Sequence, residues 1–179
     1  MKNIIFIISL FFIGQNLVGQ GKNKSKIPSV LDQTNKFDGF FDFNYDEKND
    51  IIYLTVKQLN KEFLYINSLS SGVGNNDVGL DRGQLGNERI VYFSKSGNKL
   101  LLTQPNLRYR SSSDNSLEQR SIEEAFAKSV LFGFPILENY NNGYIIDLTP
   151  FLLQDTHGVK ERLSDLGEGD FELDSLRSA

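Results

Sequence analysis

Asp155 and His157 are the residues of this chain whose types and spacing come nearest to a catalytic pair. His157 is the single histidine, and with a nearby serine the two residues resemble a hydrolytic charge relay. No G-x-S-x-G sequence supports that reading, and a lone histidine is more often a loop or packing residue. A zinc site is not expected, because the chain has no cysteine and no H-E-x-x-H sequence. We therefore predict no catalytic and no metal-binding residue in this chain.

Asp42, Asn44 and Asp46 repeat the first half of a calcium-binding loop. Glu47 stands where such a loop needs a glycine, and Tyr53 where it needs a bidentate glutamate. The aromatic residues between the three polar ones give the alternation of a half-buried strand. This alternation favours the solvated face of a strand over a calcium site.

Residues 71–86 (SGVGNNDVGLDRGQLG) form the most unusual stretch, because five glycines are mixed with polar residues. It is not a phosphate-binding loop, since it lacks G-K-[ST] and a strand–loop–helix setting. A connection of this length and glycine content is typical of a functional or docked loop, with a plain hairpin connection as the alternative. The candidate docking residues are Gly72, Gly74, Asn75, Asn76, Asp77, Gly79, Asp81, Arg82, Gly83 and Gln84.

The elements that must position these residues are mainly strands in the first half. Residues 41–45 alternate, residues 47–50 are turn formers, and residues 51–56 are β-branched and aromatic, so a hairpin is predicted. Residues 62–69 are a third strand, and residues 89–94 and 99–103 form a second hairpin. An antiparallel meander is therefore expected in the first half.

The second half mixes helix and strand. Apolar residues at spacings of four, a capping pattern at Ser121–Glu124 and a stop at Gly133 predict one amphipathic helix over about 121–132. Residues 144–148 and 171–173 are expected to be strands, and residues 150–153 and 159–163 short helices. The fold class predicted from this order is α+β.

The first 20 residues have the pattern of a secretory signal peptide. Lys2 precedes an apolar run from Ile4 to Ile13, and small residues follow at a cleavage site near Gly19. Residues 21–36 are polar and predicted to be a linker, which leaves residues 37–179 as one domain. We expect an exported protein, periplasmic or extracellular, with no membrane span. The net charge of −4 argues against a nucleic-acid partner.

Residues 63–86 (FLYINSLSSGVGNNDVGLDRGQLG) resemble the N-terminal domain of unknown function in large, exported bacterial zinc-dependent metalloproteases. These enzymes are metzincin-like and widespread in Bacteroidota. The resemblance continues, in order, through almost everything from about Lys36 onward. Its further segments are QPNLRYR (104–110), EEAFAKSVLFGFPI (123–136), DLTPFLLQDTHGV (147–159) and DSLRSA (174–179).

The resemblance implies a non-catalytic accessory domain, truncated at its C-terminal end, whose partner is a downstream catalytic protease domain. A full-length relative would be a zinc metalloendopeptidase that holds zinc and meets peptide substrates through that downstream domain. His157 matches a histidine of the accessory domain, so no zinc ligand is carried over to this chain. Apolar residues 64–66 and 132–135 are expected to contribute to the packing surface.

Two alternatives remain open at this stage. The first is a free-standing exported binding module that uses the glycine-rich loop 71–86 for recognition. The second is a hydrolase that depends on Asp155 and His157. The binding module and the accessory domain make different predictions, since a binding module should be stable and monomeric, whereas an accessory domain without its partner should expose apolar surface and be poorly soluble.

Overall fold

The computed structural model describes residues 28–72, 77–109 and 111–174. Its elements, in chain order, are η1 (Ser29–Leu31), β1 (Asn35–Phe37), β2 (Asp42–Asp46), β3 (Ile51–Val56), β4 (Phe63–Tyr65), β5 (Arg89–Ser96), β6 (Lys99–Gln104), α1 (Ser116–Ala125), β7 (Ser129–Pro135), β8 (Glu138–Tyr140), β9 (Gly143–Asp147), α2 (Thr149–Leu152) and α3 (Val159–Asp165).

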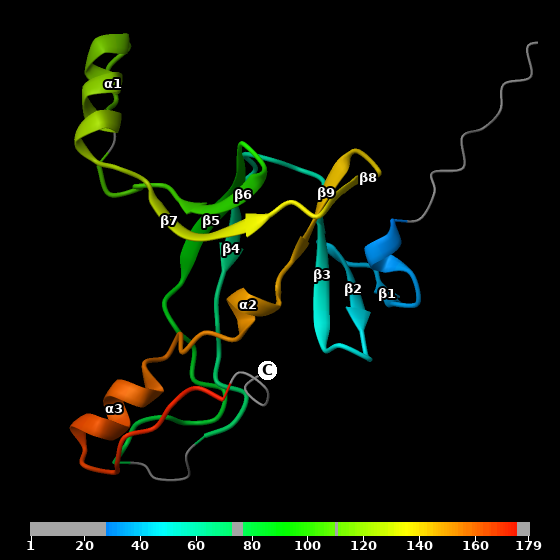
Figure 1. Cartoon of the computed structure of the whole chain (residues 1–179). Coiled ribbons are helices and arrows are strands. Elements are labelled where there is room, and N and C mark those ends of the chain that lie inside the picture. The colour runs from blue at the N-terminus through cyan, green and yellow to red at the C-terminus, as the bar shows by residue number, and fades with distance from the viewer. Residues whose placement is uncertain (1–27, 73–76, 110, 175–179) are drawn as a thin grey trace, which may run out of the picture.

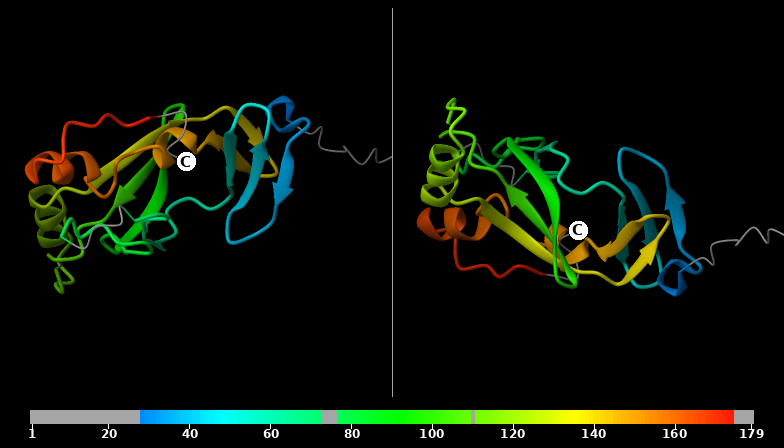
Figure 2. Two further views of the ribbon diagram at one scale, coloured as in Figure 1. Left: turned by 90° about the horizontal axis from the view of Figure 1, so that it is seen from below. Right: turned by 90° about the horizontal axis from the view of Figure 1, so that it is seen from above.

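The strands of the described residues form two antiparallel sheets. One sheet has the order β1-β2-β3-β9-β8 and the other the order β4-β5-β6-β7. Figures 1 and 2 show the five-stranded sheet at one end of the molecule, and α1 and α3 at the other end. The α+β class, with the strand-rich part first, is confirmed. The expected single meander is instead divided, because the two predicted hairpins belong to different sheets.

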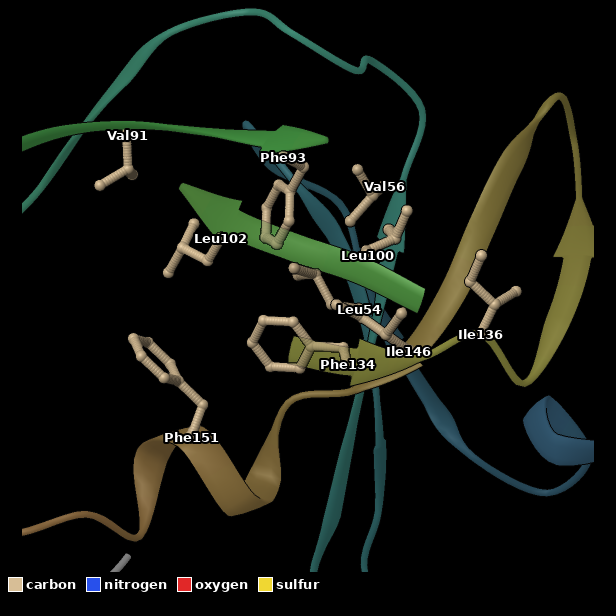
Figure 3. Close-up of a cluster of buried hydrophobic side chains, with 10 residues drawn as sticks. All are labelled: Leu54, Val56, Val91, Phe93, Leu100, Leu102, Phe134, Ile136, Ile146 and Phe151. Atoms are coloured by element: carbon tan, nitrogen blue, oxygen red, sulfur yellow. The ribbon is translucent and has the colours of Figure 1, made fainter. Parts of the chain in front are cut away.

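A single apolar core joins the two sheets. It contains ten buried residues from both sheets and from α2, drawn in Figure 3. Phe134 is fully buried and lies 4.7 Å from Phe132 and 5.8 Å from Phe151 between ring centroids. Thr149 holds α2 in place, because its hydroxyl accepts a hydrogen bond from the Ile52 amide at 2.9 Å.

The helix predicted over 121–132 is wrong in its bounds. The structure has α1 over Ser116–Ala125 and strand β7 over Ser129–Pro135. Asn115 caps α1 by accepting a hydrogen bond from the Leu117 amide, so Ser121 is an interior residue. Residues 129–135 pair with β6 and bury Phe134, and this tertiary gain outweighs a local helical pattern.

Three other predictions also differ from the structure. Residues 29–31 and 35–36 of the predicted linker are folded, because Leu31 is buried and β1 pairs with β2. Residues 171–173 belong to no strand, since they pair with no neighbour in a ladder. Residues 67–69 of the predicted third strand leave β4 and pair instead with residues 83–86. The predicted signal peptide and residues 175–179 lie outside the described residues.

Candidate functional site

The glycine-rich stretch is anchored on its own domain by a hydrogen-bonded stem. The amide of Leu69 donates to the Gln84 carbonyl at 3.0 Å, and the amide of Gly83 donates to the Leu69 carbonyl at 2.7 Å. The Gly86 amide donates to the Asn67 carbonyl at 2.8 Å. The two arms of the loop are therefore held together where they leave and rejoin the fold.

The far end of this loop packs on α3. Val78 and Leu80 are buried, and the guanidinium of Arg162 donates to the Gly79 carbonyl at 2.7 Å. Gly79 has a φ of +63°, in the left-handed region that favours glycine. A Cβ at Gly72 would lie 2.8 Å from the Arg82 amide nitrogen, so that position also needs glycine. Gly72 and Gly79 are thus explained by the local backbone and by contacts within the chain.

The predicted docking residues divide into four groups. Gly79 lies in the contact with α3, and Gly83 and Gln84 belong to the stem. The exposed members outside the stem are Gly72, Asp77, Asp81 and Arg82. Gly74, Asn75 and Asn76 lie outside the described residues.

Asp155 and His157 do not form the geometry of a charge relay. Both carboxylate oxygens of Asp155 accept hydrogen bonds from the start of α3, from the amides of Val159 at 2.8 Å and Lys160 at 2.9 Å. The His157 ring nitrogen Nε2 lies 2.9 Å from the side-chain nitrogen of Asn67. Asp155 therefore caps a helix, while His157 links the α2–α3 connection to the loop stem.

A cleft of about 500 Å³ lies beside His157. We define the α3 cleft by three segments that line it, which are residues 68–70, 152–160 and 171–174. Its exposed apolar side chains are Leu152 (44%), Phe171 (50%) and Leu173 (46%). The cleft thus combines apolar contact surface with serine, threonine and histidine side chains on its wall.

Lys160 fixes one wall of this cleft. Its ammonium group lies 2.5 Å from the Glu172 carboxylate, which holds residues 171–174 against α3. The Ser164 hydroxyl also donates to Asp170 at 3.0 Å. Neither the cleft nor Arg162 was predicted from the sequence, because residues 68, 152 and 171 meet only through the fold. Phe171 and Leu173, apolar residues in a stretch rich in acidic residues and glycine, were the one sequence signal.

Of the two apolar segments singled out in the sequence, one has exposed side chains and the other contributes to the core. Leu64 and Ile66 are exposed, at the open edge of the four-stranded sheet, whereas Phe134 is in the core.

Among the described residues, no group of three or more histidine, cysteine, aspartate or glutamate side chains could hold a metal ion. Within the same residues, no helix has the length and apolar character needed to cross a membrane.

Comparison with known proteins gives one match. Residues 83–177 match the model of a family described as a domain of unknown function (DUF5117). That region runs from the loop stem through both helices that flank the α3 cleft. No curated protein and no solved structure matches the chain.

Proposed function

This chain belongs to the DUF5117 family, and we propose that it is a non-catalytic accessory domain of an exported zinc-dependent metalloprotease. In this role the domain packs against a downstream catalytic domain through the α3 cleft. The family carries no assigned function, so the proposal depends on the sequence resemblance described above and on the surface of the cleft.

The cleft is the observation that carries the proposal. Leu152, Phe171 and Leu173 are each roughly half exposed, and all three line one hollow. Burying one such side chain contributes about 1.5–3 kcal/mol. Contiguous apolar surface of this kind is typical of protein–protein contacts.

The position of residues 171–174 also favours a partner within the same polypeptide. This segment lines the cleft, so any chain that follows it in a longer protein leaves the domain beside the cleft. A domain placed there could reach the apolar side chains without a long linker. The exposed loop residues Asp81 and Arg82 lie on the same end of the molecule, as the contact of their loop with α3 requires.

The chemistry of such a protease would belong to the partner. In the enzymes that this chain resembles, zinc activates a water molecule for attack on the peptide bond and a glutamate acts as base. The described residues offer no ligand set for that zinc. We therefore assign no step of the reaction to this chain, and its part is to shape, fold or restrain the catalytic domain.

The first experiment reads the gene beyond the codon for Ala179. If an open frame there encodes H-E-x-x-H, the encoded domain is produced separately and mixed with this chain. Sedimentation velocity then measures whether a complex forms. We expect a complex with the unaltered chain and at least tenfold weaker binding after Leu152→Glu or Phe171→Glu, because each change places a charge in an apolar contact.

Leu117→Glu is the matched control, since Leu117 is exposed on α1, away from the cleft. It should leave binding unchanged. Absence of a complex, or equal loss with the control, would contradict the proposal. A gene with no protease-like sequence would instead favour the free-standing binding module that uses loop 71–86.

A further inference from the structure

The five-stranded sheet has two further hollows, far from the α3 cleft. One has a volume of about 260 Å³ and the other of about 270 Å³, and both are lined by Asp42, Thr55 and Lys57. Because they share this wall, the two hollows lie on either side of the Asp42–Lys57 ion pair. We call them together the Lys57 groove.

The sheet itself is curled around part of this groove. The Ser29 hydroxyl, in η1 just before edge strand β1, donates to Glu138 of the opposite edge strand β8 at 2.9 Å. Thr34 and Tyr140, from the same two sides, line the larger hollow. The face of the sheet opposite the core is thus covered along its rim and open over its middle.

Polar side chains form the floor of the groove. Thr55 lies between the core residues Leu54 and Val56 and points to the opposite face, yet it is only 6% exposed. Its hydroxyl has no hydrogen-bond partner within residues 28–72, 77–109 and 111–174, and it borders both hollows. Asn44 is also buried, and its amide nitrogen donates to Thr34 at 2.9 Å. Among the described residues no buried side-chain polar atom lacks a hydrogen-bond partner, so the Thr55 hydroxyl, which has none, reaches the solvent of the hollows, where a ligand can hydrogen-bond to it.

The groove is positively charged in a protein of net charge −4. Its lining contains the ammonium groups of Lys36, Lys57 and Lys61 and the carboxylate of Asp42, and Lys36 is paired with Asp38 at 2.5 Å. Lys57 is tied to Asp42, and its hydrogen bond lowers the pKa of that carboxyl group. In the part of the chain that the structure describes, Lys61 makes no ion pair, so its charge is available to an anion.

Three phenylalanine rings lie at one end of the groove. Phe40 is 74% exposed, and its ring centroid lies 4.9 Å from Phe41 and 6.2 Å from Phe63. All three line the smaller hollow together with Lys57 and Lys61. An apolar side chain can therefore contact these rings while a carboxylate beside it reaches an ammonium group.

We propose that the Lys57 groove binds an extended peptide segment that carries a carboxylate next to a large apolar side chain. The carboxylate binds Lys61, the apolar side chain packs on Phe40, and a peptide amide donates to Thr55. Both contacts fall in the smaller hollow, where the exposed Phe40 ring lies beside Lys61. This site is separate from the α3 cleft and does not depend on the proposed accessory function.

The test measures fluorescence anisotropy of a labelled tetrapeptide of alternating phenylalanine and glutamate against the full chain. The comparison ligands are the same peptide with glutamine in place of glutamate, and a tetrasaccharide of glucuronic acid. We expect saturable binding of the acidic peptide below about 1 mM, weakened by salt, and at least fivefold weaker binding of the glutamine peptide.

Three variants locate the binding. Lys61→Ala and Phe40→Ala should each weaken the acidic peptide about fivefold to tenfold, and Thr55→Val should weaken it severalfold while it preserves strand shape. Lys48→Ala and Leu117→Ala are the controls, because both residues are exposed outside the groove, and should leave binding unchanged.

The proposal fails if the acidic peptide does not saturate by 1 mM or if the glutamine peptide binds equally well. It also fails if the three groove variants bind like the controls. Binding of the saccharide alone would overturn the ligand class. Far-ultraviolet circular dichroism of each variant separates loss of the site from loss of the fold.

Discussion

The two ends of the molecule use polar and apolar side chains in opposite ways. At the α3 end, Asp155, His157 and Arg162 all contact other parts of the chain, while Leu152 and Phe171 are exposed. At the sheet end, the apolar residues Leu54 and Val56 are in the core, while Thr55 and Asn44 face a hollow. We propose that the α3 end packs against another folded domain and that the sheet end recognises individual polar groups.

Phe134→Ala tests whether the two ends depend on one core, and it should have the largest effect. Phe134 is fully buried and contacts Phe93, Phe132 and Phe151. We expect a loss of about 3–5 kcal/mol in the free energy of unfolding, measured by urea denaturation. Both ends should unfold in one transition. Two separate transitions for the α3 end and the five-stranded sheet would show that they are independent units.

Asp155→Ala should have the next largest effect, because Asp155 caps the start of α3. Loss of such a cap costs about 1 kcal/mol. The expected result is a lower free energy of unfolding and faster amide exchange in residues 159–165, with peptide binding at the Lys57 groove unchanged. Asp155→Asn keeps a capping oxygen and should lose less. A larger effect on peptide binding at the Lys57 groove than on amide exchange in α3 would contradict the proposed difference between the two ends.

Arg162→Met separates the loop from α3, since it removes the hydrogen bond to the Gly79 carbonyl and keeps an apolar stem. We expect a cost of about 1 kcal/mol and faster exchange of the Leu80 amide. Arg120→Met is the control, because Arg120 forms an exposed ion pair with Glu124 on α1. Equal exchange of Leu80 in both variants would mean that the loop is held by other contacts.

Asp42→Asn should have the smallest effect and a distinct pH dependence. The hydrogen bond from Lys57 lowers the pKa of Asp42 in the folded state. Its contribution to stability is therefore present above the unfolded pKa of about 3.9 and is lost as the pH falls through the lower folded value. The variant should be slightly less stable at pH 7 and equal to the unaltered chain near pH 2.

Urea denaturation across this range provides the measurement, and Glu124→Gln removes a charge from an exposed ion pair as the control. A stability difference between Asp42→Asn and the unaltered chain that stayed constant from pH 7 to pH 2 would contradict the assigned role of the ion pair.

Local sequence signals predicted the hairpins well. Residues 42–46 and 51–56 pair as expected, because the turn chemistry is local and Asp46 accepts hydrogen bonds from the amides of Lys48 and Asn49. The solvated carboxylates predicted for β2 are present, with Asp42 bound to Lys57. The helix predicted over 121–132 is wrong in its second half, because the residues from 129 onward pair with β6, which lies about 30 residues earlier in the chain.

Neither of the two proposed binding surfaces was visible in the sequence, for a related reason. The α3 cleft joins segments near residues 69, 155 and 172, and the burial of Thr55 depends on the curl of the sheet that brings β1 and β8 together. No residue spacing along the chain predicts that these segments come together in the fold. The glycine-rich loop was identified correctly as unusual, but its described contacts are with its own α3, which a pattern of glycines could not specify.

Hydrogen–deuterium exchange of this chain, with and without the catalytic domain that we propose as its partner, tests the central claim most directly. The account predicts slower exchange on complex formation in residues 68–70, 152–160 and 171–174, and unchanged exchange in residues 40–61. Slower exchange confined to residues 40–61, or no change anywhere in the chain, would contradict the assignment of the α3 cleft as the surface that packs against the protease.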